Sequence, residues 1–205
     1  PHPPLVYPDN RPDAFNAIRP LIGYGPESMY VAFNRFYEPE IAHYERRNAT
    51  PDRAHNETFD ALATTGALGL LAYLVLFAAV IFYGLMWIGA VTEADRWTFA
   101  TFYAGGGVAG AAALVAWRGP EYFGVGLPFG ILLGVLAFVA WLAVTRQPAA
   151  PHEQGDCATD EWTGWIVAAL LGGIVAHFTE IHFGIGVVSS RTHFWAYAGA
   201  LIAVG

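Results

Sequence analysis

Lysine is absent from this 205-residue chain, cysteine occurs once, and charged residues make up only 13% of the sequence. In soluble domains roughly a quarter of the residues are charged. The single cysteine, Cys157, excludes a disulfide framework and a zinc site made of cysteines. All ten cationic residues are arginines and the formal net charge is −7, so the chain offers no basic surface to a nucleic-acid backbone. The composition therefore excludes a disordered chain and predicts no nucleic-acid partner.

The sequence contains three long runs without a charged residue. Residues 61–92, 97–117 and 122–145 contain no Asp, Glu, Lys or Arg. A helix needs about 20 apolar residues to cross a hydrocarbon core that is about 30 Å thick. The runs predict an all-α, multi-pass integral membrane protein with about five transmembrane helices. The predicted spans are approximately 66–91, 97–117, 122–145, 162–179 and a truncated 192–205.

The residue types at the run ends and inside the runs agree with membrane crossing. Aromatic rings that favour the headgroup zone stand near the run ends. They are Trp87, Trp97, Trp117, Tyr122, Trp141 and Trp162. Glycines 105–107 with Gly110, and Gly130 with Gly134, put small residues on one helix face, which allows close packing in lipid. We interpret these glycines as packing residues and not as a phosphate-binding loop.

The charged residues concentrate at the beginning of the chain. Residues 1–60 hold nine of the seventeen acidic residues and six of the ten arginines. We predict that 1–60 form a large extramembrane loop and that 61–205 form the transmembrane region, with 147–161 as a solvated linker. The arginines of the short loops are equally divided between the two sides, so they do not orient the protein. The acidic excess of 1–60 favours the outer face. Because the chain ends inside an apolar run, we expect it to be an internal piece of a longer protein.

A polar segment directly before the first apolar run is the most informative for chemistry. Thr50, Pro51 and Asp52 are typical of a helix start, as a cap, a first-turn proline and an acid that complements the helix dipole. This start would place His55 and Asn56 in the opening turns of the first span. The free N–H groups of a helix N-terminus attract anions.

A spacing pattern extends from this segment into the first apolar run. His55-Asn56 is followed by nine residues and then by Gly66-Ala67-Leu68-Gly69. This resembles the His-(Asn/Ser/Gln)-x9-Gly-x-x-(Gly/Thr/Tyr) signature of the O-antigen ligase and polymerase superfamily. Upstream, Arg19-Pro20-Leu21-Ile22-Gly23-Tyr24-Gly25-Pro26 is similar to the Pro-x-x-Gly-x-Gly entry to the same large loop of that family. The resemblance covers roughly residues 14–92.

The resemblance implies a bacterial membrane glycosyltransferase of the inner membrane, with residues 1–60 facing the periplasm. Members of the family move a glycan from a polyprenyl-diphosphate carrier to a hydroxyl acceptor, which can be a glycolipid. They do so with inversion and without a nucleotide sugar, a metal or another cofactor. The essential histidine of the family's loop corresponds to His55 in this sequence. The sequence does not distinguish a ligase from a polymerase.

The chemistry of this transfer can be assigned to residue types near His55. The leaving diphosphate needs positive charge, and the acceptor hydroxyl needs help in losing its proton. An imidazole can act as that base or can donate to the diphosphate, and both roles stay open. We expect His55 to be catalytic and a set of mostly arginine side chains to bind substrate. The set is Arg19, Arg46, Arg47, Arg53, Asn56 and Arg191.

A second group of ionisable residues lies at the end of the fourth predicted span. Glu180 and Arg191 can form a structural ion pair that closes a short turn, which we favour. A metal site made of His177, Glu180, His182 and His193 is less favoured, because the spacing is not His-Glu-x-x-His. If His55 is catalytic, Arg191 lies on the same side of the membrane and can reach the diphosphate.

Two other functions remain open from the sequence. The chain can be a non-catalytic subunit that packs against other membrane subunits through its glycine-rich helices. It can also be a transporter that uses Glu180 and Arg191 in a substrate path. The enzyme hypothesis requires His55, Arg19 and the Arg46/Arg47 pair to converge on one outer-face cavity that is open to lipid. The transporter hypothesis requires a polar cavity at mid-membrane around Glu180.

Overall fold

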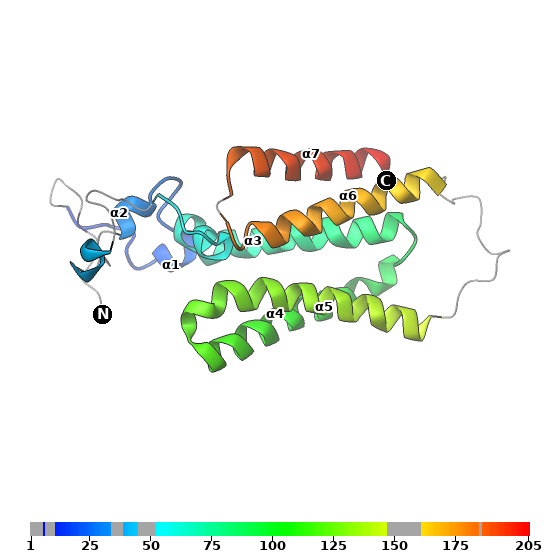
Figure 1. Cartoon of the computed structure of the whole chain (residues 1–205), viewed down its shortest axis with the longest axis horizontal. Coiled ribbons are helices and arrows are strands. Elements are labelled where there is room, and N and C mark those ends of the chain that lie inside the picture. The colour runs from blue at the N-terminus through cyan, green and yellow to red at the C-terminus, as the bar shows by residue number, and fades with distance from the viewer. Residues whose placement is uncertain (1–5, 7–10, 34–38, 45–51, 147–160, 185) are drawn as a thin grey trace. The chain divides into compact units, whose positions relative to one another are not determined.

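The computed structural model describes residues 6, 11–33, 39–44, 52–146, 161–184 and 186–205. Their regular structure is helical, apart from one isolated bridge between Val6 and Pro12. The α-helices are α1 (Arg19–Ile22), α2 (Met29–Phe33), α3 (Glu57–Trp87), α4 (Arg96–Arg118), α5 (Phe123–Thr145), α6 (Glu161–Glu180) and α7 (Val188–Val204) (Figure 1). Three short 3-10 helices complete the set, η1 (Pro39–His43), η2 (Glu93–Asp95) and η3 (Pro120–Tyr122).

Four helical segments are long and apolar enough to cross a bilayer, judged by length and composition. They are Glu57–Trp87, Glu93–Arg118, Pro120–Thr145 and Trp162–Glu180. The all-helical fold and four of the five predicted apolar helices are therefore confirmed. The fifth, α7, has 17 residues and is not among these four.

The helix that contains most of the first predicted span has different bounds from that span. We expected residues 66–91, but α3 runs from Glu57 to Trp87. The helix begins earlier because Glu57 and Asp60 are acidic residues of its first turn, where the helix dipole favours negative charge. It ends earlier because the chain leaves the helix at Gly89, which has a positive φ of 73°.

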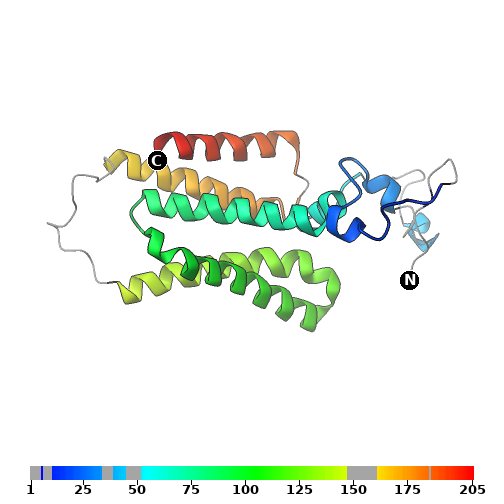
Figure 2. The same ribbon diagram turned by 180° about the vertical axis from the view of Figure 1, so that it is seen from behind.

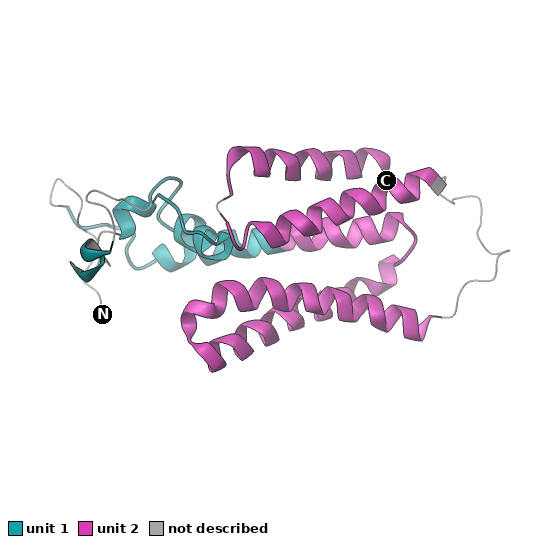
Figure 3. Ribbon diagram, in the orientation of Figure 1, with its two compact units in different colours: residues 1–74 teal, residues 75–205 magenta. Residues whose placement is uncertain are grey.

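The chain divides into two compact units, residues 1–74 and 75–205, which are coloured separately in Figure 3. The division falls inside α3. The first unit contains the segments before α3 and the first half of that helix. The second contains the rest of α3 and all later helices.

In the second unit, α4 and α5 run side by side in both views (Figures 1 and 2). Their glycines bring the two backbones together. A Cβ on Gly106 would lie 2.4 Å from the carbonyl oxygen of Gly130, and one on Gly110 would lie 2.4 Å from that of Gly126. This confirms the packing role predicted for Gly106, Gly110 and Gly130, since only hydrogen side chains permit such an approach. Gly105, predicted with them, faces open space.

Aromatic side chains fill the contact among α3, α6 and α7 in the same unit. The ring of Phe77 lies 4.8 Å from that of Phe178 and 4.7 Å from that of Phe194, centre to centre. All three side chains are buried. Tilted and stacked rings at this spacing contribute packing energy beyond their buried area.

The turn between α3 and α4 is tied to the end of α5. The Asp95 carboxylate accepts hydrogen bonds from the N–H and the hydroxyl of Thr92, at 2.7 and 2.8 Å. Arg146 donates to the same carboxylate oxygen and, over 3.0 Å, to the carbonyl of Ala90. These contacts fix the α3–α4 corner against the last residue before the region 147–160.

Candidate functional site

The first unit contains a loop that docks on a kink in α3. Helix α1 ends at Gly23, whose backbone has φ 70° and ψ −173°. Helix α3 contains Gly66, with nearly the same angles, φ 69° and ψ −170°. This region of conformational space is essentially restricted to glycine. Both positions are glycines of the motifs found in the sequence.

The two glycines lie against each other's chain segments. A Cβ on Gly23 would lie 2.4 Å from the carbonyl carbon and oxygen of Thr64. A Cβ on Gly66 would lie 2.4 Å from the carbonyl group of Leu21 and 2.5 Å from the nitrogen of Gly23. No side chain fits between these backbones.

The kink also supplies the acceptors for the loop. A straight helix would use the carbonyls of Ala63 and Thr64 for N–H groups four residues later. Here the N–H of Tyr24 donates to Ala63 over 2.8 Å and the N–H of Gly25 donates to Thr64 over 2.9 Å. The backbone of the Gly23-Tyr24-Gly25 segment thus bonds directly to α3. The two motifs, about thirty residues apart in sequence, form one substructure.

The start of α3 differs from the sequence prediction. We expected Thr50 as the cap and Pro51 in the first turn, but both lie outside the described residues and α3 begins at Glu57. Asn56 is the residue before the helix, and its Oδ1 accepts the N–H of Phe59 over 3.2 Å. This is the geometry of an asparagine N-cap, which satisfies a helix donor that has no partner inside the helix. The amide oxygen of Asn56 therefore has a structural task.

His55 precedes this cap and is exposed to solvent. The expectation that it lies inside the opening turns of the helix is wrong, because residues 52–56 are not helical. The imidazole belongs to a short irregular segment that leads into the helix N-terminus. Its exposure leaves it accessible to a ligand.

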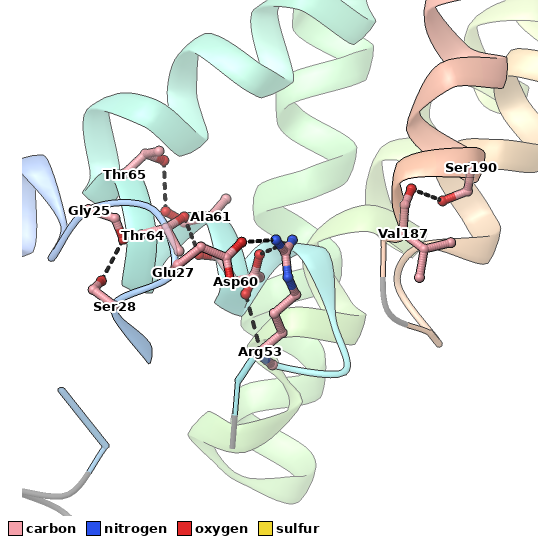
Figure 4. Close-up of polar contacts among 11 residues, drawn as sticks. Gly25, Glu27, Ser28, Arg53, Asp60, Ala61, Thr64, Thr65, Val187 and Ser190 are labelled. Carbon is pink, nitrogen blue, oxygen red and sulfur yellow. Dashed lines mark hydrogen bonds and ion pairs between the residues drawn. The ribbon is translucent and has the colours of Figure 1, made fainter. Parts of the chain in front are cut away.

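The guanidinium of Arg53 lies between two carboxylates (Figure 4). Its Nη2 forms a short ion pair with Glu27 Oε1, and its Nη1 lies 3.9 Å from Asp60 Oδ2. The N–H of Ala54 also donates to Asp60 Oδ1 over 3.4 Å. Asp60 is buried on the first turn of α3, whereas the Glu27 side chain is largely exposed. The irregular segment before α3 is therefore attached both to the helix and to the loop that carries Glu27.

The guanidinium of Arg19 is also fully engaged by neighbouring groups. Its Nε and Nη2 donate to the two carboxylate oxygens of Asp13 over 2.7 and 3.0 Å. Its Nη1 donates to the carbonyl of Gly23 over 2.9 Å, and its guanidinium lies over the rings of Phe15 and Tyr24. The carboxylate of Asp13 is only 1% exposed. These contacts give Arg19 the role of fixing the end of α1.

Three predicted site residues lie outside the described part of the first unit. Arg46 and Arg47 lie outside the described residues. Arg191 lies in the first turn of α7, in the second unit. Its neighbourhood includes Ser190, whose hydroxyl donates to the carbonyl of Val187 over 3.0 Å (Figure 4).

A cluster of ionisable side chains at the end of α6 includes His177, Glu180 and His182. Glu180 Oε2 lies 3.7 Å from His177 Nδ1, one helical turn away, a contact that becomes an ion pair only when the imidazole is protonated. Glu180 is the last residue of α6 and is exposed. The side chain of His182 is buried, with Nδ1 2.5 Å from the carbonyl oxygen of Phe178. Burial lowers the pKa of His182 to about 4, so this imidazole is neutral at physiological pH.

Three carboxylates of the first unit were not singled out from the sequence: Asp13, Glu27 and Asp60. Each holds an arginine that was singled out. Asp13 and Arg19 are six residues apart, but Glu27 and Arg53 are 26 apart, a separation that carries no local signal.

A scan of protein-family models finds no match to this chain, and searches of curated proteins and of solved structures find none either. The likeness to the O-antigen ligase and polymerase superfamily therefore rests on the motif residues themselves.

Proposed function

We propose that this chain is part of a multi-pass membrane glycosyltransferase that moves a glycan from a polyprenyl-diphosphate carrier to a hydroxyl acceptor. The observation that carries the proposal is the contact between the two motif segments. Gly23 and Gly66 come from the two sequence patterns that resemble the family, and their backbones touch. This contact supports the proposal because both patterns belong to one large loop in the family that they resemble.

The position of His55 supports the assignment of a catalytic group. The imidazole is exposed and lies one residue before the N-cap of α3. As a base, it would accept the proton of the acceptor hydroxyl while the acceptor oxygen bonds to the anomeric carbon and the diphosphate leaves with the electrons of its bond. As a donor, it would stabilise the charge on the departing diphosphate.

The helices support a membrane location. Four segments have the length and apolarity to span a bilayer. Trp97, Trp117 and Trp162, at or near the ends of these segments, are all more than two thirds exposed. Arg118 lies over the ring of Trp117 at 4.3 Å, a pairing suited to the headgroup zone. We propose a multi-pass protein of a bacterial inner membrane whose residues 1–60 face the periplasm.

The decisive experiment is glycan transfer by the full-length protein in membranes, with wild type compared with His55→Ala. We expect transfer from the lipid-linked donor to fall by at least about a hundredfold in the variant, as for loss of a general base. His43→Ala is the matched control, because His43 is another exposed histidine of the same unit. Unchanged transfer in His55→Ala would refute the catalytic assignment.

The alternative functions receive less support from the described residues. Glu180 ends α6 and is exposed, which is not the mid-helix position that a transporter path around it would need. Most glycines of α4 and α5 that a subunit interface would use are already packed against the facing helix, and Gly105 of α4 is open. A complex with other subunits remains compatible with the exposed helix faces.

A further inference from the structure

The loop that carries Glu27 is anchored on both sides of this residue. The N–H of Gly25 donates to Thr64 of α3, and the hydroxyl of Ser28 donates back to the carbonyl of Gly25 over 2.5 Å (Figure 4). Glu27 lies between these anchored residues. Its φ of 54° makes it the one non-glycine residue in the left-handed region among the described residues. A residue with a Cβ is disfavoured there, so the loop holds Glu27 in a costly conformation.

The segment that carries Arg53, the partner of Glu27, is also held in place. Asp60 is buried on the first turn of α3 and receives both the guanidinium of Arg53 and the N–H of Ala54. The segment that precedes the helix is thus attached through a side chain and through its backbone. His55 follows Ala54 directly, so its position depends on these contacts.

The two terminal nitrogens of Arg53 both face carboxylates. Nη2 forms an ion pair with Glu27 and Nη1 faces Asp60. A guanidinium that grips a diphosphate would offer these same two nitrogens. In this geometry two carboxylates already neutralise the cation on that side.

We propose that Glu27 and Arg53 are positioning residues that fix His55 at the start of α3, and that Arg53 does not bind the lipid-linked donor. The ion pair joins the loop docked at the Gly66 kink to the segment that carries the imidazole. The catalytic part of this inference rests on the proposed function, whereas the structural part does not.

The first measurement needs no activity. Hydrogen exchange of the full-length protein in nanodiscs is followed by mass spectrometry for wild type, Glu27→Gln and the control Glu40→Gln. Glu40 is an exposed carboxylate of η1 in the same unit. We expect peptides that cover 52–56 to exchange at least about fivefold faster in Glu27→Gln, with peptides of α4 and α5 unchanged as a check of the fold. Unchanged exchange at 52–56 would overturn the proposal.

The second measurement separates positioning from binding. The lipid-linked donor is varied in transfer assays with Glu27→Gln, Arg53→Gln, Arg53→Lys and the double variant Glu27→Gln/Arg53→Gln. We expect each single Gln variant to lower kcat about tenfold with KM for the donor within about twofold, because a displaced catalytic group slows chemistry more than binding. The double variant should be no worse than Arg53→Gln, and Arg53→Lys should recover part of kcat.

A different pattern would assign Arg53 to the donor. A raised KM in Arg53→Gln, with Glu27→Gln close to wild type and additive effects in the double variant, would overturn the proposal. If the wild-type protein transfers no glycan, the proposed function fails, and the exchange measurement alone decides whether Glu27 and Arg53 fix the segment.

Discussion

Gly23 and Gly66 share one backbone conformation and lie against each other's chain segments, so that the loop before α2 and the kink of α3 interlock. The contact has two consequences. It makes the two positions intolerant of any side chain, and it frees two α3 carbonyls that the loop N–H groups then use.

Replacing either glycine with alanine should detach the loop. For Gly23→Ala and Gly66→Ala we expect a loss of more than about 2 kcal/mol in the stability of the first unit, because a strained φ adds to a backbone collision and to weakened hydrogen bonds. Hydrogen exchange at the N–H groups of Tyr24 and Gly25 would measure it.

Gly25→Ala is the control for these variants. Gly25 also has a positive φ, 105°, but a Cβ there would meet nothing within 4 Å. Its substitution therefore carries the conformational cost without the collision. A Gly25→Ala variant as damaging as Gly23→Ala would contradict the interlocking contact as the cause.

The pair of Arg19 and Asp13 predicts a structural effect that a partner substitution reduces. Arg19→Gln leaves the carboxylate of Asp13 buried without its bidentate guanidinium, which typically costs about 3–5 kcal/mol. Asp13→Asn/Arg19→Gln removes the uncompensated charge, so we expect the double variant to be more stable than Arg19→Gln alone. Thermal unfolding in detergent would compare the variants. Equal stability of the single and the double variant would show that the uncompensated Asp13 carboxylate is not the cause of the loss in Arg19→Gln.

The helices were predictable from the sequence where charge alone decides their limits. Arg96 and Arg118 bound an uncharged run, and α4 begins and ends at these residues. The start of α3 was not predictable in this way. Thr50 and Asn56 are both cap-forming types, and the choice between them depends on contacts of the preceding segment with Asp60.

The site was predictable as a set of motifs and not as a geometry. Gly66 within an apolar run is compatible with an uninterrupted helix, and the kink has meaning only with the loop that supplies Tyr24 and Gly25 as donors. Arginines were expected at the ligand, but the structure pairs Arg19 and Arg53 with carboxylates. Sequence spacing gives no register for a proline-rich segment, so these partners could not be assigned.

Neighbouring glycines of α4 allow a sharp test of helix packing. Gly106→Ala should separate α4 from α5, because its Cβ would lie 2.4 Å from a backbone oxygen of Gly130. Such overpacking typically costs about 1–3 kcal/mol. Gly105→Ala, one residue earlier, meets nothing within 4 Å and should leave stability unchanged or slightly raised. The measurement is thermal unfolding of both variants in the same detergent, and equal losses would contradict the packing role.

His182 predicts that acid weakens the second unit. Its pKa falls from an ordinary value of 6.5 to about 4 because the ring is buried. Between these values the unfolded chain binds a proton that the folded chain excludes, so stability is complete above pH 6.5 and is lost as the pH falls towards 4. The loss can reach about 3 kcal/mol.

Acid can destabilise a protein through several kinds of ionisable group, so the effect of His182 is measured as a difference between variants. His182→Asn keeps an N–H that can donate to the carbonyl of Phe178 and does not titrate. Thermal stability of this variant should fall less than that of wild type between pH 6.5 and pH 4. His43→Asn removes an exposed histidine and should keep the wild-type pH dependence. Parallel curves for wild type and His182→Asn would mean that the buried imidazole is not what excludes the proton, and the acid sensitivity would then have to come from other ionisable groups.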